Sequence, residues 1–158
     1  MSANNPAPEN AGVIAPPPLI YTGPLLAGLL LNRVRPAPFL PRPLARAAGW
    51  SLTAAGMALA AWFITTMRRA GTPVDPREPV RRIVTDGPFR FSRNPGYSAM
   101  ALMYVGISCL ANARWPLLWL PAVLAVIQRG VIEREERYLS RTFGDEYDRY
   151  RSRVRRWI

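Results

Sequence analysis

The segment AAGWSLTAAGMALAAWFITTM, residues 47–67, contains 21 consecutive residues without a charged side chain. A helix of that length, at 1.5 Å per residue, can cross the hydrocarbon core of a bilayer, which is about 30 Å thick. A second uncharged run of 20 residues covers 94–113. A third, 115–132, is interrupted only by Arg129, whose long side chain can reach the membrane surface from a helix end. These runs predict three membrane-spanning helices.

Residues 10–32 form a fourth uncharged region, in which prolines limit the helix to about 19–31. These prolines are Pro16, Pro17, Pro18 and Pro24. We therefore expect an all-α membrane protein with about four transmembrane helices and a cytoplasmic C-terminal helical segment. Residues 1–15 are predicted to be a disordered polar tail, and residues 16–158 a single membrane-embedded domain.

The charged residues exclude several kinds of chemistry. The net charge is +11, all 21 basic residues are arginine, and the chain has no Lys and no His. A lysine nucleophile, a histidine base and a histidine metal ligand are therefore excluded. The single cysteine, Cys109, lies among apolar residues and is predicted to be a small core residue, so we expect neither a disulfide nor a metal site. The long uncharged runs favour a lipid bilayer over nucleic acid as the partner of this positive charge.

The arginines are distributed unevenly between the two predicted sides of the membrane. Seven lie in residues 68–93 and nine in 129–156, whereas the other two loops hold four, within 33–46, and one, Arg114. Arginine-rich loops favour the cytoplasmic side. The sequence therefore predicts an inner-membrane protein whose 68–93 loop and C-terminal segment face the cytoplasm.

Two polar motifs are predicted to meet at that cytoplasmic face. GPFRFSRNPGY, residues 87–97, leads into the uncharged run 94–113, and EREERYL, residues 133–139, follows the run 115–132. On a helix, Glu135 and Glu136 border the apolar face, whereas Glu133 lies on the solvated side. We expect one of Glu135 and Glu136 to bind a ligand. Past Gly144, a predicted helix end, a new amphipathic helix carries tyrosines that could close a pocket from below.

These two motifs, in this order and at this separation, resemble the isoprenylcysteine carboxyl methyltransferase family, in its short bacterial and archaeal form, which is related to the phospholipid methyltransferases. The resemblance covers about residues 80–158, the expected catalytic half. It implies a membrane enzyme that binds S-adenosylmethionine from the cytosol and accepts a lipid-like substrate from the bilayer. The cofactor contacts that it implies are Arg81, Arg82, Ile83, Val84, Phe89, Asn94, Pro95, Gly96, Tyr97 and Glu135, with Glu136 as the other member of the glutamate pair.

The sequence departs from the family pattern at two positions. Asn94 occupies the place of a histidine, so this position can act through a neutral hydrogen bond but not as a base. Val131 occupies the place of an arginine associated with the substrate. Arg129 and Arg134 are the nearest candidates to orient a substrate carboxylate.

The absence of histidine favours a carboxylate as the methyl acceptor. A carboxylate has a free lone pair at neutral pH, whereas an amine must first lose a proton, which calls for a base. The expected reaction is therefore methylation of the carboxylate of a prenylated or lipid-like molecule. A phospholipid N-methyltransferase is the alternative, and a non-enzymatic scaffold that binds anionic lipid is a more distant one. A sterol reductase typically has ten spans, for which this chain is too short. The sequence does not determine the oligomeric state.

Overall fold

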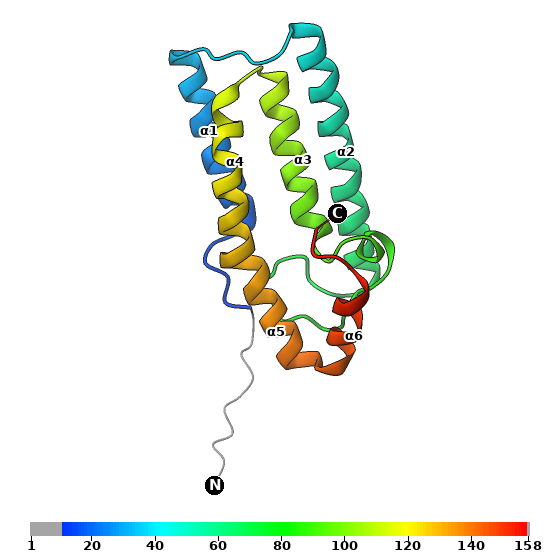
Figure 1. Ribbon diagram of the computed structural model, residues 1–158. Helices are drawn as coiled ribbons and strands as arrows, with labels where there is room; N and C mark the ends of the chain where they lie inside the picture. The colour runs from blue at the N-terminus through cyan, green and yellow to red at the C-terminus, as the bar shows by residue number, and fades with distance from the viewer. Residues whose placement is uncertain (1–10, 158) are drawn as a thin grey trace.

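The computed structural model describes residues 11–157, and this part of the chain is helical with connecting loops (Figure 1). Four long helices pack side by side: α1 (Pro17–Val34), α2 (Arg42–Arg69), α3 (Pro95–Leu110) and α4 (Arg114–Ile127). A short 3-10 helix, η1 (Gly87–Arg90), precedes α3. A π-helical turn, η2 (Gln128–Ile132), leads from α4 into α5 (Glu133–Phe143), and α6 (Asp145–Arg153) follows. The predicted all-α architecture is confirmed.

Within residues 11–157, two helices are long and apolar enough to cross a membrane: α2, and the continuous helix Arg114–Phe143 that α4 begins. The apolar helix α3 is shorter, with 16 residues. The helix α1 begins at Pro17, earlier than expected, because proline is tolerated in the first turn, and it continues through Pro24. The count of four transmembrane helices therefore remains a prediction.

Helices α2 and α3 approach each other closely because glycines line their contact. A Cβ atom added to Gly49 would lie 2.8 Å from the backbone nitrogen of Leu110, and one added to Gly106 would lie 3.0 Å from the backbone oxygen of Gly49. Gly56 likewise faces the backbone of Ala99, at 2.9 Å. Small residues at such crossings are typical of helices that pack within membranes.

The core lies between α1, α3 and α4 and includes Tyr21, Leu25 and Tyr104. The hydroxyl of Tyr104 donates to the backbone oxygen of Pro116 at 2.8 Å, which satisfies its polar group inside the core. Cys109 is buried, as predicted. Large apolar side chains also lie on the outer faces of the helices, among them Leu26, Leu30, Trp50, Met57 and Trp62. An outward apolar surface of this kind suits contact with lipid.

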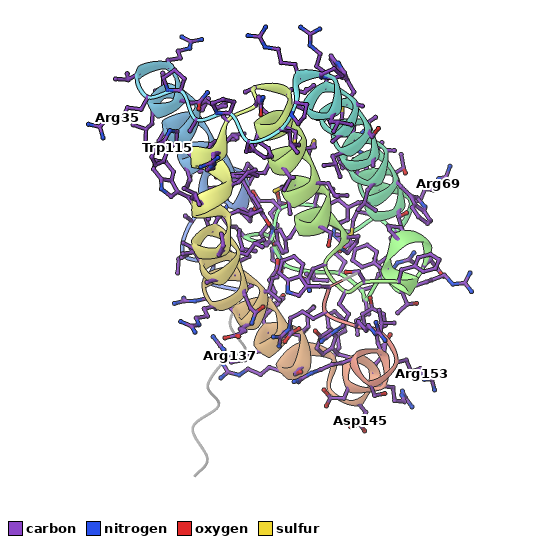
Figure 2. The ribbon with its side chains drawn as sticks, turned by 45° about the horizontal axis from the view of Figure 1, so that its top comes forward. Arg35, Arg69, Trp115, Arg137, Asp145 and Arg153 are labelled. Atoms are coloured by element: carbon purple, nitrogen blue, oxygen red, sulfur yellow. The ribbon has the colours of Figure 1, made fainter. Side chains whose placement is uncertain are left out.

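The α1–α2 and α3–α4 connections meet at one end of the bundle. The side-chain oxygen of Asn112, a residue in the left-handed region with φ 46°, accepts from the backbone nitrogens of Phe39 and Leu40 at 3.1 and 3.2 Å. Figure 2 shows Arg35 and Trp115 at this end, and Arg137, Asp145 and Arg153 at the other. The segments that connect the helices thus lie in two groups at opposite ends of the bundle, as the sequence predicted.

Residues 11–15 belong to the predicted polar tail, and three of them contact the helices. The backbone nitrogen of Ile14 donates to the oxygen of Gly130 at 3.3 Å, and the Arg134 guanidinium donates to the oxygen of Gly12 at 2.8 Å. Val13 packs against the core. Apolar side chains interrupt the polar composition of this segment and can pack against the helices. The backbone oxygen of Gly130, in the π turn, accepts the hydrogen bond from Ile14. Residues 1–10 of the predicted tail lie outside the described residues.

Candidate functional site

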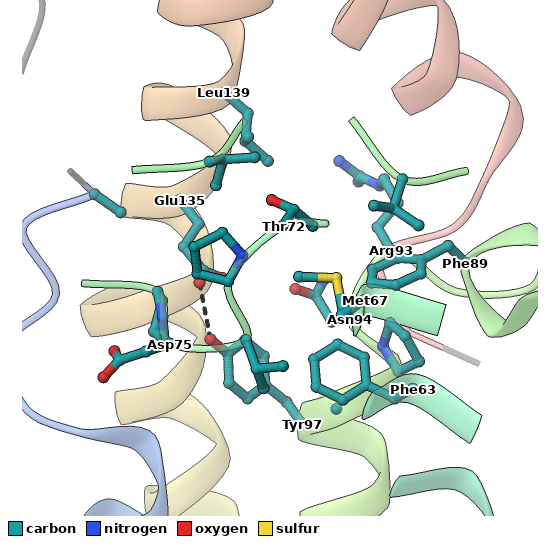
Figure 3. Close-up of a pocket in the computed structure, with 18 of the residues that line it drawn as sticks. Phe63, Met67, Thr72, Asp75, Phe89, Arg93, Asn94, Tyr97, Glu135 and Leu139 are labelled. Carbon is teal, nitrogen blue, oxygen red and sulfur yellow. Dashed lines mark hydrogen bonds between the residues drawn. The ribbon is translucent and has the colours of Figure 1, made fainter. Parts of the chain in front are cut away.

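A cavity of about 450 Å³ lies at the end of the bundle that carries α5 and α6 (Figure 3). The end of α2, the loop of residues 72–84, the segment 89–97, α5 and α6 all contribute to its walls, together with Pro16–Pro18. Its volume falls in the range of small-molecule sites, about 300–1,000 Å³. The cavity therefore brings together parts of the chain that are distant in sequence.

Ten of the eleven predicted cofactor residues line this cavity. They are Arg82, Ile83, Val84, Phe89, Asn94, Pro95, Gly96, Tyr97, Glu135 and Glu136. Arg81 does not line it: its side chain is exposed, and its backbone nitrogen donates to Thr72 Oγ1 at 3.3 Å.

Tyr97 and Glu135 join the two sequence motifs. The Tyr97 hydroxyl donates to Glu135 Oε1 at 2.9 Å, the bond drawn as a dashed line in Figure 3. Tyr97 lies in the first turn of α3, which Pro95 begins, and Glu135 lies in the first turn of α5. The predicted meeting of the motifs is confirmed. Glu135 lines the cavity with a carboxylate that keeps lone pairs free for a cationic ligand.

Glu136 has a different environment from its neighbour. Its Oε1 lies 2.8 Å from Arg93 Nη1, and its Oε2 lies 2.7 Å from Arg156 Nη2. Arg156 Nε also donates to Glu136 Oε1, at 3.0 Å. The residue is buried, and both carboxylate oxygens are engaged by guanidinium groups. One of these two glutamates is expected to bind a ligand. Within the described residues, Glu136 is paired with two arginines, whereas the Glu135 carboxylate has no ion pair with a basic side chain.

The last described residues, Arg155–Trp157, form a C-terminal strap across the base of α3. Arg93 N donates to the Arg155 oxygen at 2.8 Å, and Ser92 Oγ to the Arg156 oxygen at 3.1 Å. Asn94 Nδ2 donates to the same oxygen at 2.9 Å. The buried Asn94 therefore donates to the strap as a neutral side chain, the kind of hydrogen bond that the sequence allows at this position.

Aromatic side chains form much of the cavity wall. The rings of Phe63 on α2 and Phe89 are 5.7 Å apart. A Cβ atom on Gly96 would lie 3.0 Å from the Phe63 ring, so this glycine makes room for Phe63. Tyr147 and Tyr150 line the cavity from α6, and the Tyr150 hydroxyl donates to the Phe89 oxygen at 2.8 Å. The expectation that these tyrosines close a pocket is confirmed.

Several cavity residues were not predicted. Phe63 and Met67 lie in an uncharged run in which no local pattern distinguishes them from lipid-facing residues. Asp75 also lines the cavity, and a hydrogen bond from Arg77 lowers the pKa of the Asp75 carboxyl below its usual value. The sequence pattern indicated Arg93 only as one of the seven arginines in residues 68–93. Its place directly before the Asn94–Tyr97 turn was the signal that could have identified it.

Arg129 and Arg134, the predicted carboxylate-orienting residues, do not line this cavity. Arg129 borders a separate hollow with Gln128 and Trp157, and Arg134 is exposed and bonded to Gly12. Arg129 lies within the π turn, and Arg134 lies in the first turn of α5. Val131 lies fully buried in the core.

Comparison with known proteins gives a family for this arrangement. The family model for phospholipid methyltransferases matches residues 44–146, well over half of the chain. The chain belongs to the phospholipid methyltransferase family. It is also similar to an uncharacterized protein of Haemophilus influenzae, with 50% identity over 44 residues, which are 27% of this chain and 70% of that protein. No solved structure matches the chain.

Membership in the phospholipid methyltransferase family indicates a membrane methyltransferase. The matched residues include all but the first two residues of α2, both polar motifs and the first residues of α6. They exclude α1 and the C-terminal strap. The Arg156 contacts to Glu136 are thus outside the part that the family model describes.

Proposed function

We propose that this protein transfers a methyl group from S-adenosylmethionine to a lipid-like acceptor, with the cofactor in the 450 Å³ cavity. The observation that carries the proposal is the Tyr97–Glu135 pair at the cavity wall of a methyltransferase family member. Glu135 provides a carboxylate for the ammonium of the cofactor's methionine part. The fit is supported by the size of the cavity and by its aromatic walls.

The aromatic residues suit the other parts of the cofactor. Phe63, Phe89 and Tyr97 offer ring faces for adenine stacking and for a sulfonium, which is attracted to the π system. Arg82, Ile83 and Val84 line the cavity from the loop, and the Asn94–Tyr97 turn forms its base. We propose these residues, with Glu135, as the cofactor contacts.

S-adenosylmethionine supplies an activated methyl group, whose direct displacement needs an in-line nucleophile with a free lone pair. The protein's part is to hold the reactants in line and to keep water away. Tyr147 and Tyr150 close the cavity on the α6 side, while Phe63 and Met67 close it on the α2 side. No step on the protein side requires a histidine.

The proposed acceptor is the carboxylate of a prenylated or otherwise lipid-like molecule. This choice is supported by Asn94, whose side-chain amide donates to the backbone at the place where a base would be needed for an amine. A phospholipid amine is the second candidate, and the description of the matched family favours it. For that acceptor, the carboxylates in the cavity wall that could accept the proton are those of Asp75, Glu135 and Glu136.

The reaction is proposed to occur at the cytoplasmic face of the inner membrane. Sixteen of the 21 arginines lie in the segments that form this end, within 68–93 and 129–156. Basic residues of this kind favour the cytoplasmic side.

Titration of S-adenosylhomocysteine into the detergent-purified protein, followed by calorimetry, tests the cofactor. We expect saturable binding at one site per chain. Absence of heat at millimolar ligand would contradict both methyltransferase candidates.

The acceptor is tested with a methyl-labelled cofactor and a total lipid extract. Label in a methyl ester is released as methanol by mild base, whereas label on a methylated amine is retained. Release supports the carboxylate acceptor, and retention supports the phospholipid amine.

A further inference from the structure

A second hollow, of about 420 Å³, lies between α3 and α4, two helices that run side by side (Figure 1). It is lined by Ala101 from α3, by Leu124 and Ala125 from α4, and by Gln128, Arg129 and Trp157. None of these residues lines the 450 Å³ cavity. The hollow is therefore a separate site, to which the proposed reaction gives no role.

The hollow is apolar along the two helices and polar at one end. Ala101 lies nine residues before α3 ends and Ala125 eleven residues after α4 begins, so both are about 14 to 16 Å from the connection between these helices. Gln128 lies nearly one turn further toward the cavity end, where the indole nitrogen of Trp157 donates to Gln128 Oε1 at 3.2 Å. An apolar groove that ends at polar groups matches an amphiphilic ligand.

Arg129, at the polar end of the hollow, carries a charge that the folded chain leaves unpaired. It is exposed and forms no ion pair with another side chain among residues 11–157. Arg129 follows Arg114, at the opposite end of the bundle, by 15 residues, so the two lie about 22 Å apart along the helix. That length is less than the roughly 30 Å of hydrocarbon in a bilayer. The Arg129 guanidinium must therefore extend toward the headgroups, where lipid phosphates are the available anions.

We propose that this hollow binds one anionic phospholipid from the leaflet at the cavity end, with the lipid phosphate on Arg129 and an acyl chain between α3 and α4. The small side chains of Ala101 and Ala125 leave room for the chain. The Trp157 ring borders the hollow at its polar end, where an amphipathic indole suits the boundary between hydrocarbon and headgroups. The inference does not depend on methyl transfer, because the hollow and the cavity share no residue.

Native mass spectrometry of the full chain in detergent tests the phosphate contact. Dioleoylphosphatidylglycerol is the anionic probe, and dioleoylphosphatidylcholine, with the same chains but no net charge, is its comparison. Arg129→Gln removes the proposed phosphate partner. Arg137→Gln is the matched control, because it removes the same charge from an exposed position of α5 that lines neither the hollow nor the cavity.

Two further variants test the acyl-chain contact. Ala125→Phe fills the hollow from α4. Ala122→Phe adds the same ring at an exposed position of α4 that does not line the hollow. Thermal unfolding followed by circular dichroism reports whether each variant is folded, and the Arg129 and Arg137 pair tests the inference even if a phenylalanine variant is not.

We expect the wild type to bind one phosphatidylglycerol about fivefold or more tightly than phosphatidylcholine, the effect of a single arginine near an anionic headgroup. Arg129→Gln should abolish most of this preference, and Arg137→Gln should retain it. Ala125→Phe should weaken the binding of both lipids by about fivefold or more, and Ala122→Phe should change it by less than about twofold.

Equal effects of Arg129→Gln and Arg137→Gln would overturn the inference, because they indicate attraction to the diffuse surface charge. Unchanged lipid binding in Ala125→Phe would also overturn it, since the headgroup alone would then be held. So would a wild type that is a lipid-free dimer, in which a second copy of the chain could cover the hollow.

Discussion

Three glutamates within four positions of α5 have three different environments. Glu133 lies at the surface, 4.0 Å from Arg156 Nη1, with 35% of its side chain exposed. Glu135 lines the cavity with Tyr97 as its donor, and Glu136 is buried between two arginines. Successive positions on a helix are rotated by about 100°, so neighbouring carboxylates face different partners. One residue type thus contributes a surface contact, a carboxylate in the cavity wall and an internal ion pair.

Glu135→Ala should weaken the binding of S-adenosylhomocysteine by about tenfold or more, because the ligand ammonium loses its carboxylate. Glu133→Ala is the matched control and should change the dissociation constant by less than about twofold, as expected for an exposed charge. Calorimetric titration of both variants measures the difference. Equal effects would contradict the assignment of Glu135 to the cavity.

Glu136→Ala should destabilise the protein by roughly 3–5 kcal/mol, since it leaves two arginines without their shared carboxylate. Glu133→Ala again serves as the control and should leave stability within about 0.5 kcal/mol. Thermal unfolding in detergent, followed by circular dichroism, compares the two. A loss no greater than that of the control would show that the buried cluster does not stabilise the fold.

At the scale of elements, the site depends on how closely α2 approaches α3. The glycines at their contact bring the end of α2 to the cavity, where Phe63 packs against Gly96. The π turn then leads from the apolar helix α4 into α5, and its Gly130 accepts a backbone bond from Ile14. Such π turns are frequent at functional sites.

Gly106→Ala should lower stability by about 1–3 kcal/mol, because the added methyl group would lie 2.7 Å from the backbone nitrogen of Thr53. Gly23→Ala is the control: this glycine is also helical, and a Cβ atom there has no neighbour within 4 Å. It should leave stability unchanged or slightly higher. If both variants unfolded at the temperature of the wild type, close packing would not be what holds α2 to α3.

The sequence predicted the helices and much of the cavity, for reasons that these elements make clear. Uncharged runs reveal helices such as 47–67 because the bilayer imposes a length on them. The meeting of the two polar motifs could be predicted because both lie at one face of the predicted membrane, whereas the Tyr97–Glu135 hydrogen bond itself is seen only in the structure. Phe63 could not be identified, since its role depends on which face of α2 meets α3. The pairing of Glu136 with Arg156 depends on how the chain returns after α6, which no local pattern encodes.

In the whole molecule, charge is concentrated at the ends of an apolar bundle. The cavity end carries the arginines of 68–93 and 129–156, and the opposite end those of 33–46 together with Arg114. The net charge of +11 is thus compatible with apolar lateral surfaces, because the two properties occupy different parts of the molecule. This separation is the pattern expected of a protein that lies across a bilayer.

The orientation can be tested with single cysteines in a Cys109→Ala background. Pro36→Cys, in the α1–α2 connection, should react with an impermeant maleimide in right-side-out vesicles. Arg153→Cys, at the end of α6, should react only in inside-out vesicles, because the cavity end is expected in the cytoplasm. Labelling of both cysteines from the same side would contradict the proposed topology.

The C-terminal strap has a consequence for the order in which the protein is made. Arg155–Trp157 follow all the helices in sequence, yet Asn94 and Glu136 depend on them for their contacts. A ribosome releases these residues after α1 to α4 have already been synthesised. The helices can therefore enter the membrane first, and the cavity end of the bundle can reach its final form only after translation has passed residue 157.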